Sequence, residues 1–208
     1  DIALLNDTDL RTLIGLLCEA DFRMAGLSTS GILWGGHQDA PDGGLDVIVR
    51  SNIEPPKNSF IPRMKTGFQV KKTDMQPSRI KREMKPTGEL REEIKKLISG
   101  KGAYIIVNSS GSTTNRALTL RVEAMRTAVA DEPNYQQLHL DFYDQDRIAT
   151  WVRTYSSMIL WVRNKIGGPL QGWRPYYNWL NMPAGIQVDY IVDEKTRLFD
   201  GINSEKGE

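Results

Sequence analysis

The stretch Ala103-Tyr104-Ile105-Ile106-Val107 is a short, uninterrupted apolar run. A run of this length without polar alternation is typical of a strand that is covered on both faces. Apolar residues recur at helical spacing on either side of it, in residues 89–99 and 112–129. The sequence therefore predicts an α/β fold in which this run is a buried central strand of a mixed sheet flanked by helices.

Further elements are expected towards the N-terminus. Asn6 or Asp7 is positioned to cap a first helix that ends at Gly26. Residues 28–34 are typical of a strand, and residues 45–50 and 67–72 predict an antiparallel pair of strands. Pro77 and Pro86 are interpreted as interruptions between this pair and the 89–99 helix.

The C-terminal half continues the alternation. Ser112 or Thr114 is expected to begin the helix after the apolar run, and a strand follows at residues 138–142. From Asp144 or Asp146, a single long helix is predicted to end at residues 167–169, because apolar side chains share one face throughout residues 148–166.

The chain of 208 residues fits one domain of ordinary size with a C-terminal extension. We expect the domain to span residues 1–168. Residues 169–208 are rich in aromatic residues and proline and are too few for a second core, which favours an extension or a linker to a neighbouring domain.

Composition excludes several classes of protein. One cysteine, Cys18, rules out a disulfide framework within the chain and favours a reducing, cytoplasmic setting. No apolar run approaches the roughly 18 residues that a membrane-spanning helix needs, and no secretory signal is evident. Phosphate-cradling GxxxxGK loops, HExxH motifs and paired CxxC motifs are also absent, so ATPase and zinc-hydrolase functions lose their usual support.

Positive charge is concentrated in one part of the chain, although the formal net charge is only +1. From Lys57 to Lys85 there are nine basic residues and two acidic ones. Such a segment is suited to an anionic partner. The alternative interpretation is a solvated basic face without a partner. The candidates for contacts with nucleic-acid phosphates are Lys72, Arg79, Lys81 and Arg82.

Two short motifs carry candidate chemistry. Asp42-Gly43-Gly44-Leu45-Asp46 leads into one strand of the expected antiparallel pair, and Phe68-Gln69-Val70-Lys71 lies on the other. Because side chains alternate along a strand, Gln69 and Lys71 share a face and can converge with Asp46. Oxygen ligands for a hard cation beside a lysine suit phosphodiester hydrolysis. Each residue alone has a simpler explanation. Asp46 could be a turn residue before the strand, and Lys71 could be an edge-strand lysine that discourages aggregation.

In their order, these motifs resemble the Mrr-type branch of the PD-(D/E)xK nucleases, over residues 10–162. The resemblance implies a restriction-endonuclease-like core and a catalytic site of Asp46, Gln69 and Lys71. It implies that Asp46, Gln69 and the backbone carbonyl of Val70 hold the metal, with glutamine in the position of the second acidic residue.

The chain departs from this family at the first helix. A metal-facing glutamate is often found there at a position that corresponds to Gly15, and Glu19 lies one helical turn further along the same face. Glu19 is therefore a secondary catalytic candidate. The alternative interpretation is that Glu19 is a solvent-exposed helix glutamate without a catalytic role.

The expected function is that of a Mg²⁺-dependent endodeoxyribonuclease, with Mn²⁺ as an alternative metal, acting on double-stranded DNA with little sequence preference. Residues 168–179 resemble the segment that follows nuclease effectors in large bacterial antiviral proteins with ATPase cores. That likeness implies a defence effector, either a homo-oligomer or part of a larger parent chain. The alternatives are a binding or scaffold module that does not cleave, and an RNA-directed nuclease.

Overall fold

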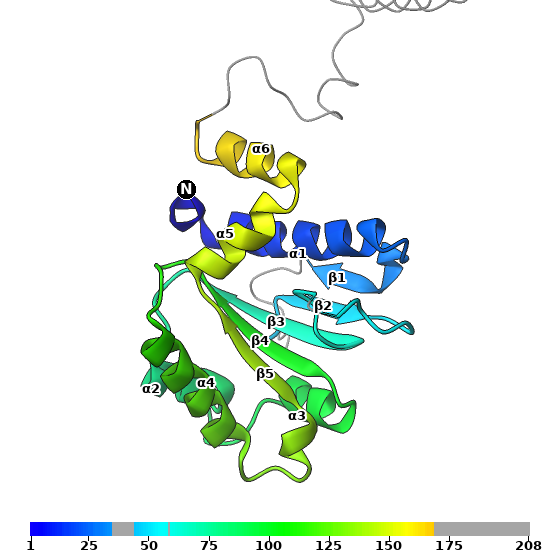
Figure 1. Ribbon diagram of the computed structural model, residues 1–208. Coiled ribbons are helices and arrows are strands. Elements are labelled where there is room, and N and C mark those ends of the chain that lie inside the picture. The colour runs from blue at the N-terminus through cyan, green and yellow to red at the C-terminus, as the bar shows by residue number, and fades with distance from the viewer. Residues whose placement is uncertain (35–43, 58, 169–208) are drawn as a thin grey trace, which may run out of the picture. The chain divides into compact units, whose positions relative to one another are not determined.

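The computed structural model describes residues 1–34, 44–57 and 59–168 (Figure 1). Among these residues, one mixed sheet has the strand order β1-β2-β3-β4-β5. The first three strands are antiparallel neighbours, and the last three are parallel. The strands are β1 (Ile32–Trp34), β2 (Val47–Arg50), β3 (Lys65–Lys71), β4 (Ala103–Asn108) and β5 (His139–Tyr143).

Helices cover both faces of the sheet, which confirms the α/β class. In Figure 1, α1, α5 and α6 lie above the sheet, and α2, α3 and α4 lie below it. The α-helices are α1 (Asp7–Met24), α2 (Pro77–Met84), α3 (Glu92–Ser99), α4 (Asn115–Val129), α5 (Gln145–Arg153) and α6 (Ser156–Lys165). Short 3-10 turns are η1 (Ile2–Leu4), η2 (Thr29–Gly31) and η3 (Tyr135–Gln137).

The apolar run that predicts the fold is β4, and all of its residues are buried. Ile105 and Val107 belong to the core on the side of α1, whereas Tyr104 and Ile106 belong to the core on the side of α2, α3 and α4. Between β3 and β5, this strand is therefore covered on both faces as expected.

The helix caps follow the sequence signals. The Asn6 side chain accepts from the Asp9 N–H at 2.8 Å, and α1 is followed by Gly26 with a positive φ of 68°. Thr114 caps α4 and Asp144 caps α5, each through a side-chain oxygen. The predicted antiparallel pair is β2 and β3.

Three sequence interpretations were wrong in detail. Residues 28–34 are strand only from Ile32, after the turn η2. Pro77 does not interrupt a segment but occupies the first turn of α2. Proline is tolerated there because a backbone N–H in the first turn has no acceptor within the helix. Residues 145–165 form two helices instead of one.

The break between α5 and α6 lies at Tyr155, whose backbone is extended. Its hydroxyl donates to the Asp21 carboxylate at 2.6 Å, and the Trp151 indole donates to the same carboxylate at 3.0 Å. Both helices still place their apolar residues on the core beside α1, so the predicted shared face is confirmed although the helix is not continuous.

Candidate active site

Asp46 stands immediately before β2 and is held against β3. Its N–H donates to the Phe68 carbonyl at 2.8 Å, and its Oδ2 accepts from the Val70 N–H at 2.7 Å. Its Oδ1 lies 3.4 Å from the Arg11 Nε. Burial raises the pKa of Asp46, although the Val70 hydrogen bond and the charges of Arg11 and Lys71 oppose this. Asp46 therefore lies in the electrostatic field of the residues on β3.

Gln69 and Lys71 project from one face of β3, as the alternation of side chains predicts. Gln69 is only 1% exposed. Its side-chain oxygen accepts from the buried Tyr104 hydroxyl, and its amide nitrogen donates to the Glu83 Oε1 at 2.6 Å. The Lys71 Nζ lies 3.1 Å from the same Glu83 oxygen. Both β3 side chains thus meet at one carboxylate.

Glu83, like Arg11 and Arg91, is a residue of this cluster that the sequence did not predict. It lies on α2, which buries Ile80 and Met84 against the core and so presents Glu83 to β3. Burial opposes ionisation of Glu83, but the charges of Lys71 and Arg91 outweigh it and lower the pKa of this carboxyl. The overlooked signal was Pro77, which starts α2 instead of breaking the chain.

Arg91 ties Glu83 to the glycine turn before Asp46. Its Nε donates to the Glu83 backbone carbonyl at 2.7 Å, and its Nη2 lies 3.1 Å from the Glu83 Oε1. Gly44 has a φ of 88°, and a Cβ there would come within 2.6 Å of the Arg91 side chain. Glycine is required at residue 44 for both reasons, the backbone conformation and the space for the arginine.

α1 contributes Arg11 to the cluster, and the structure does not bring Glu19 there. Glu19 instead accepts from the Trp34 Nε1 at 2.9 Å and from Arg23 at 2.6 Å. Gly15 lies under the Trp34 ring, since a Cβ at that position would be 2.4 Å from the indole. At the position where the resembled family has a glutamate, this chain therefore has an indole packed on a glycine.

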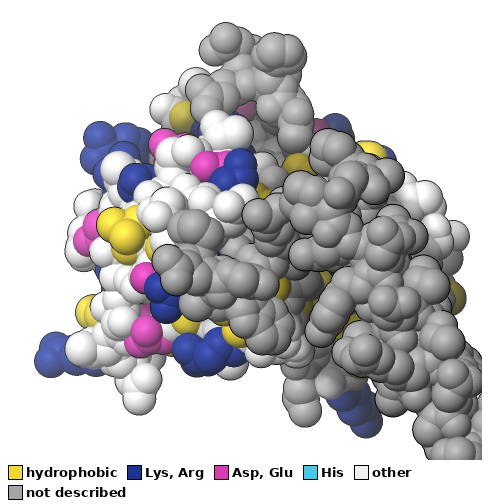
Figure 2. Space-filling model, turned by 90° about the horizontal axis from the view of Figure 1, so that it is seen from above, with side chains coloured by type: hydrophobic (Ala, Val, Ile, Leu, Met, Phe, Trp, Pro, Cys, Tyr) yellow, Lys and Arg dark blue, Asp and Glu magenta, His cyan; other side chains and the backbone are white. Residues whose placement is uncertain are grey.

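The basic candidates lie next to this cluster along the chain. Arg79, Lys81 and Arg82 are exposed on α2, and Lys72 directly follows Lys71 and is half-buried. On the opposite face, that of α1, α5 and α6, the described charges of both signs are interspersed, as Figure 2 shows. Three exposed basic side chains thus lie on one short helix, α2. Asp42 lies outside the described residues.

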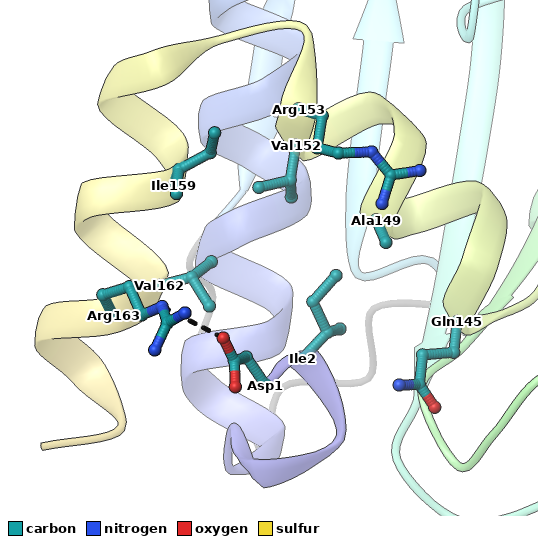
Figure 3. Close-up of a pocket in the computed structure, with 9 residues that line it drawn as sticks. All are labelled: Asp1, Ile2, Gln145, Ala149, Val152, Arg153, Ile159, Val162 and Arg163. Carbon is teal, nitrogen blue, oxygen red and sulfur yellow. Dashed lines mark ion pairs between the residues drawn. The ribbon is translucent and has the colours of Figure 1, made fainter. Parts of the chain in front are cut away.

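A cavity of about 400 Å³ opens elsewhere, between η1, α5 and α6 (Figure 3). An ion pair of 3.1 Å between Asp1 and Arg163 spans its edge. The cavity contains none of the sequence-predicted site residues, and its walls are largely apolar. The lining residues are Asp1, Ile2, Gln145, Ala149, Val152, Arg153, Ile159, Val162 and Arg163.

The chain has no match among known proteins that would identify it. No family model, curated protein or solved structure matches it. Within residues 1–34, 44–57 and 59–168, no helix is both long and apolar enough to cross a membrane.

A divalent cation can be tested against the donors of this cluster. No group of three or more acidic, histidine or cysteine residues that could hold a metal occurs in the described part of the chain. Asp46 and Glu83 remain as two carboxylates. Because the N–H and C=O of one strand residue point to the same side, the Val70 carbonyl faces the β2 side of β3, where Asp46 lies. Mg²⁺ commonly uses one or two carboxylates with water and phosphate oxygens, so these donors fit it.

Proposed function

We propose that this chain is a metal-dependent nuclease that hydrolyses the phosphodiester bonds of double-stranded DNA. The observation that carries the proposal is the convergence of Asp46 with the β3 residues. Asp46 is bonded to the backbone of Val70 and lies in the field of Lys71, at the point where the β2 and β3 pair ends. A carboxylate and an ammonium group so placed suit the hydrolysis of a phosphate ester.

Each group has a separate role in this proposal. The Asp46 carboxylate and the Val70 carbonyl are oxygen donors for Mg²⁺ or Mn²⁺, which would lower the pKa of water and offset charge on the phosphate. Lys71 orients the attacking water and stabilises the negative charge that develops on the phosphate. Gln69 is buried behind them and fixes the face of β3 on which they act.

The charge of the cluster supports an anionic substrate. Arg11, Lys71 and Arg91 contribute three positive charges, whereas Asp46 and Glu83 contribute two negative ones. One positive charge is in excess before any metal is bound. The exposed basic side chains of α2 extend this field along the surface, where they would contact phosphates without reading the base sequence.

Plasmid cleavage tests the proposal directly. The purified chain with supercoiled plasmid and Mg²⁺ or Mn²⁺ should produce nicked and linear forms, and EDTA should stop the reaction. Lys71→Met should lower the rate by about a hundredfold or more. Lys95→Met is a matched control, because Lys95 and Lys71 are both 32% exposed and both pair with a glutamate. Equal rates for the two variants would exclude a catalytic Lys71.

A second candidate is a nucleic-acid-binding or scaffold module that does not cleave. It is favoured by the ion pairs of the cluster, since Asp46, Lys71 and Glu83 already have charged partners within the chain. Retention of plasmid DNA on the protein, without cleavage in either metal, would support this candidate. A single-stranded and structured RNA substrate in the same assay distinguishes the RNA-directed alternative.

The expectations about assembly concern residues 169–208, which lie outside the described residues. Membership of a larger antiviral protein and activation by oligomerisation therefore stay predictions. Fusion of the chain to a dimeric or tetrameric scaffold would test activation by oligomerisation, because the specific activity should then exceed that of the dilute, unfused chain. Equal specific activities would exclude it.

A further inference from the structure

Both ends of the Gln69 side-chain amide are hydrogen-bonded within the chain. Its carbonyl oxygen accepts from Tyr104, which is fully buried, and its amide nitrogen faces Glu83. A carboxylate can only accept hydrogen bonds, so Glu83 fixes which end of the amide points towards it. The oxygen of Gln69 then points to Tyr104, away from Glu83.

The carboxylate of Glu83 contacts both polar side chains of the β3 motif, Gln69 at 2.6 Å and Lys71 at 3.1 Å. We infer that Glu83, joined to Gln69 and Lys71 at the end of β3, is the second carboxylate of this site and that Gln69 is a positioning residue. The inference rests on the proposed nuclease function and names a further metal ligand for it. Glu83 comes from α2, not from the strand that carries the sequence motif.

The contacts of Glu83 leave one oxygen for a ligand. Gln69, Lys71 and Arg91 all contact Oε1, at 2.6, 3.1 and 3.1 Å. No donor from the described residues contacts Oε2. Because an ionised carboxylate has about four acceptor positions, Glu83 can bind a cation through Oε2 and keep its contacts through Oε1.

The supports of Glu83 indicate that its position is built into the fold. The Tyr104 hydroxyl, from β4, donates to the side-chain oxygen of Gln69. Arg91 holds both the backbone and the side chain of Glu83 and passes over Gly44, two residues before Asp46. The same arginine thus holds Glu83 and lies against the turn that leads to Asp46, and outer contacts of this kind are typical of metal ligands.

Binding of Mn²⁺ to the full chain without DNA, measured by calorimetry, tests the inference independently of cleavage. Glu83→Gln should weaken Mn²⁺ binding by about tenfold or more, as should Asp46→Asn. Glu93→Gln is the matched control, because the Glu93 and Glu83 side chains are both 23% exposed and both pair with a lysine. Its Mn²⁺ affinity should equal that of the unmodified chain.

A double variant guards against simple loss of the fold. Gln69→Glu with Glu83→Gln remakes the amide to carboxylate hydrogen bond in the reverse direction and should recover the melting temperature. Mn²⁺ binding should stay weak, because the carboxylate now bonds to Tyr104. Gln69→Leu should weaken Mn²⁺ binding, and saturating Mn²⁺ should restore part of the lost cleavage rate, as expected of a residue that acts through Glu83.

The outcomes separate this inference from the proposed function. Unchanged Mn²⁺ affinity in Glu83→Gln, or recovered affinity in the double variant, overturns the role of Glu83. If Asp46→Asn still abolishes metal-dependent cleavage in that case, the nuclease proposal stands. An unmodified chain that neither binds Mn²⁺ nor cleaves DNA overturns both.

Discussion

The Val70 N–H donates to the Asp46 carboxylate at 2.7 Å, so a backbone group of β3 positions the first carboxylate of the site. This bond is made one residue before Lys71 and just beyond the last residue of the β2 and β3 pair. Since the strands fix both partners, Asp46 is positioned by the sheet itself and does not depend on a mobile side-chain network.

Asp46→Asn is predicted to separate stability from activity. Burial raises the pKa of Asp46, so its charged form at neutral pH is less favourable in the folded chain than in the unfolded one. Asparagine keeps an oxygen for Val70 and removes that charge. We expect a melting temperature no lower than that of the unmodified chain, and a cleavage rate lower by about a hundredfold or more.

Asp46→Leu should be compared with Asp46→Asn. It leaves the Val70 N–H without its acceptor, which typically costs about 1–3 kcal/mol for a buried donor. In a chain of this size, each kcal/mol corresponds to a change of about 2–4 °C in melting temperature. Thermal unfolding that is indistinguishable between the asparagine and leucine variants would refute the structural role assigned to this bond.

The sequence predicts the central part of the site because strand periodicity is strong there. Gln69 and Lys71 are two residues apart on a strand, so they share a face whatever the tertiary structure. Asp46 joins them through the antiparallel pair, which the prolines and glycines between the strands indicate. Arg11 and Glu83 could not be placed in this way, since their positions depend on how α1 and α2 pack on the sheet.

Helix boundaries show a similar limit. The apolar positions of residues 148–166 continue in one register across Tyr155, so periodicity alone cannot reveal the break between α5 and α6. A hydrogen bond to Asp21, 134 residues earlier in the chain, holds Tyr155 in the extended conformation. For α2, the rule that proline starts helices would have predicted the element that carries Glu83.

Variants of Glu19 test the secondary candidate. The Glu19 carboxylate accepts from the partly buried Trp34 indole, so Glu19→Ala should lower the melting temperature. The loss of a hydrogen bond to a charged group is expected to cost about 1.5–3 kcal/mol. Glu19→Gln keeps an acceptor for Trp34 and should lower the temperature less. If Glu19→Gln abolished cleavage with normal unfolding, the catalytic role implied by the family resemblance would be supported instead.

The basic face of α2 is predicted to act through phosphates. Replacing Arg79, Lys81 and Arg82 with glutamine should weaken binding to unrelated duplex sequences alike. The slope of log affinity against log salt should become shallower by about 0.9 for each phosphate that the protein no longer neutralises. Arg116, Arg126 and Arg153, which are exposed on other helices, provide a control triple variant. An identical slope for both triple variants would show that α2 is only a solvated face.

Asp21 is predicted to make the stability of the fold depend on pH. Burial raises its pKa above the ordinary value of 3.8, despite the hydrogen bonds from Tyr155 and Trp151. The folded chain therefore holds this proton more tightly than the unfolded chain. The stability that protonated Asp21 contributes is fully present below pH 3.8 and is lost as the pH rises through the folded pKa.

Asp21→Asn removes this dependence, because asparagine stays neutral. The melting temperature of Asp21→Asn, minus that of the unmodified chain, should be more positive at about pH 7 than at about pH 3.5. Asp7→Asn is the control, because it removes a carboxylate from the exposed first turn of the same helix. A temperature difference for Asp21→Asn that is constant with pH would mean that burial does not disfavour the Asp21 charge in the folded chain.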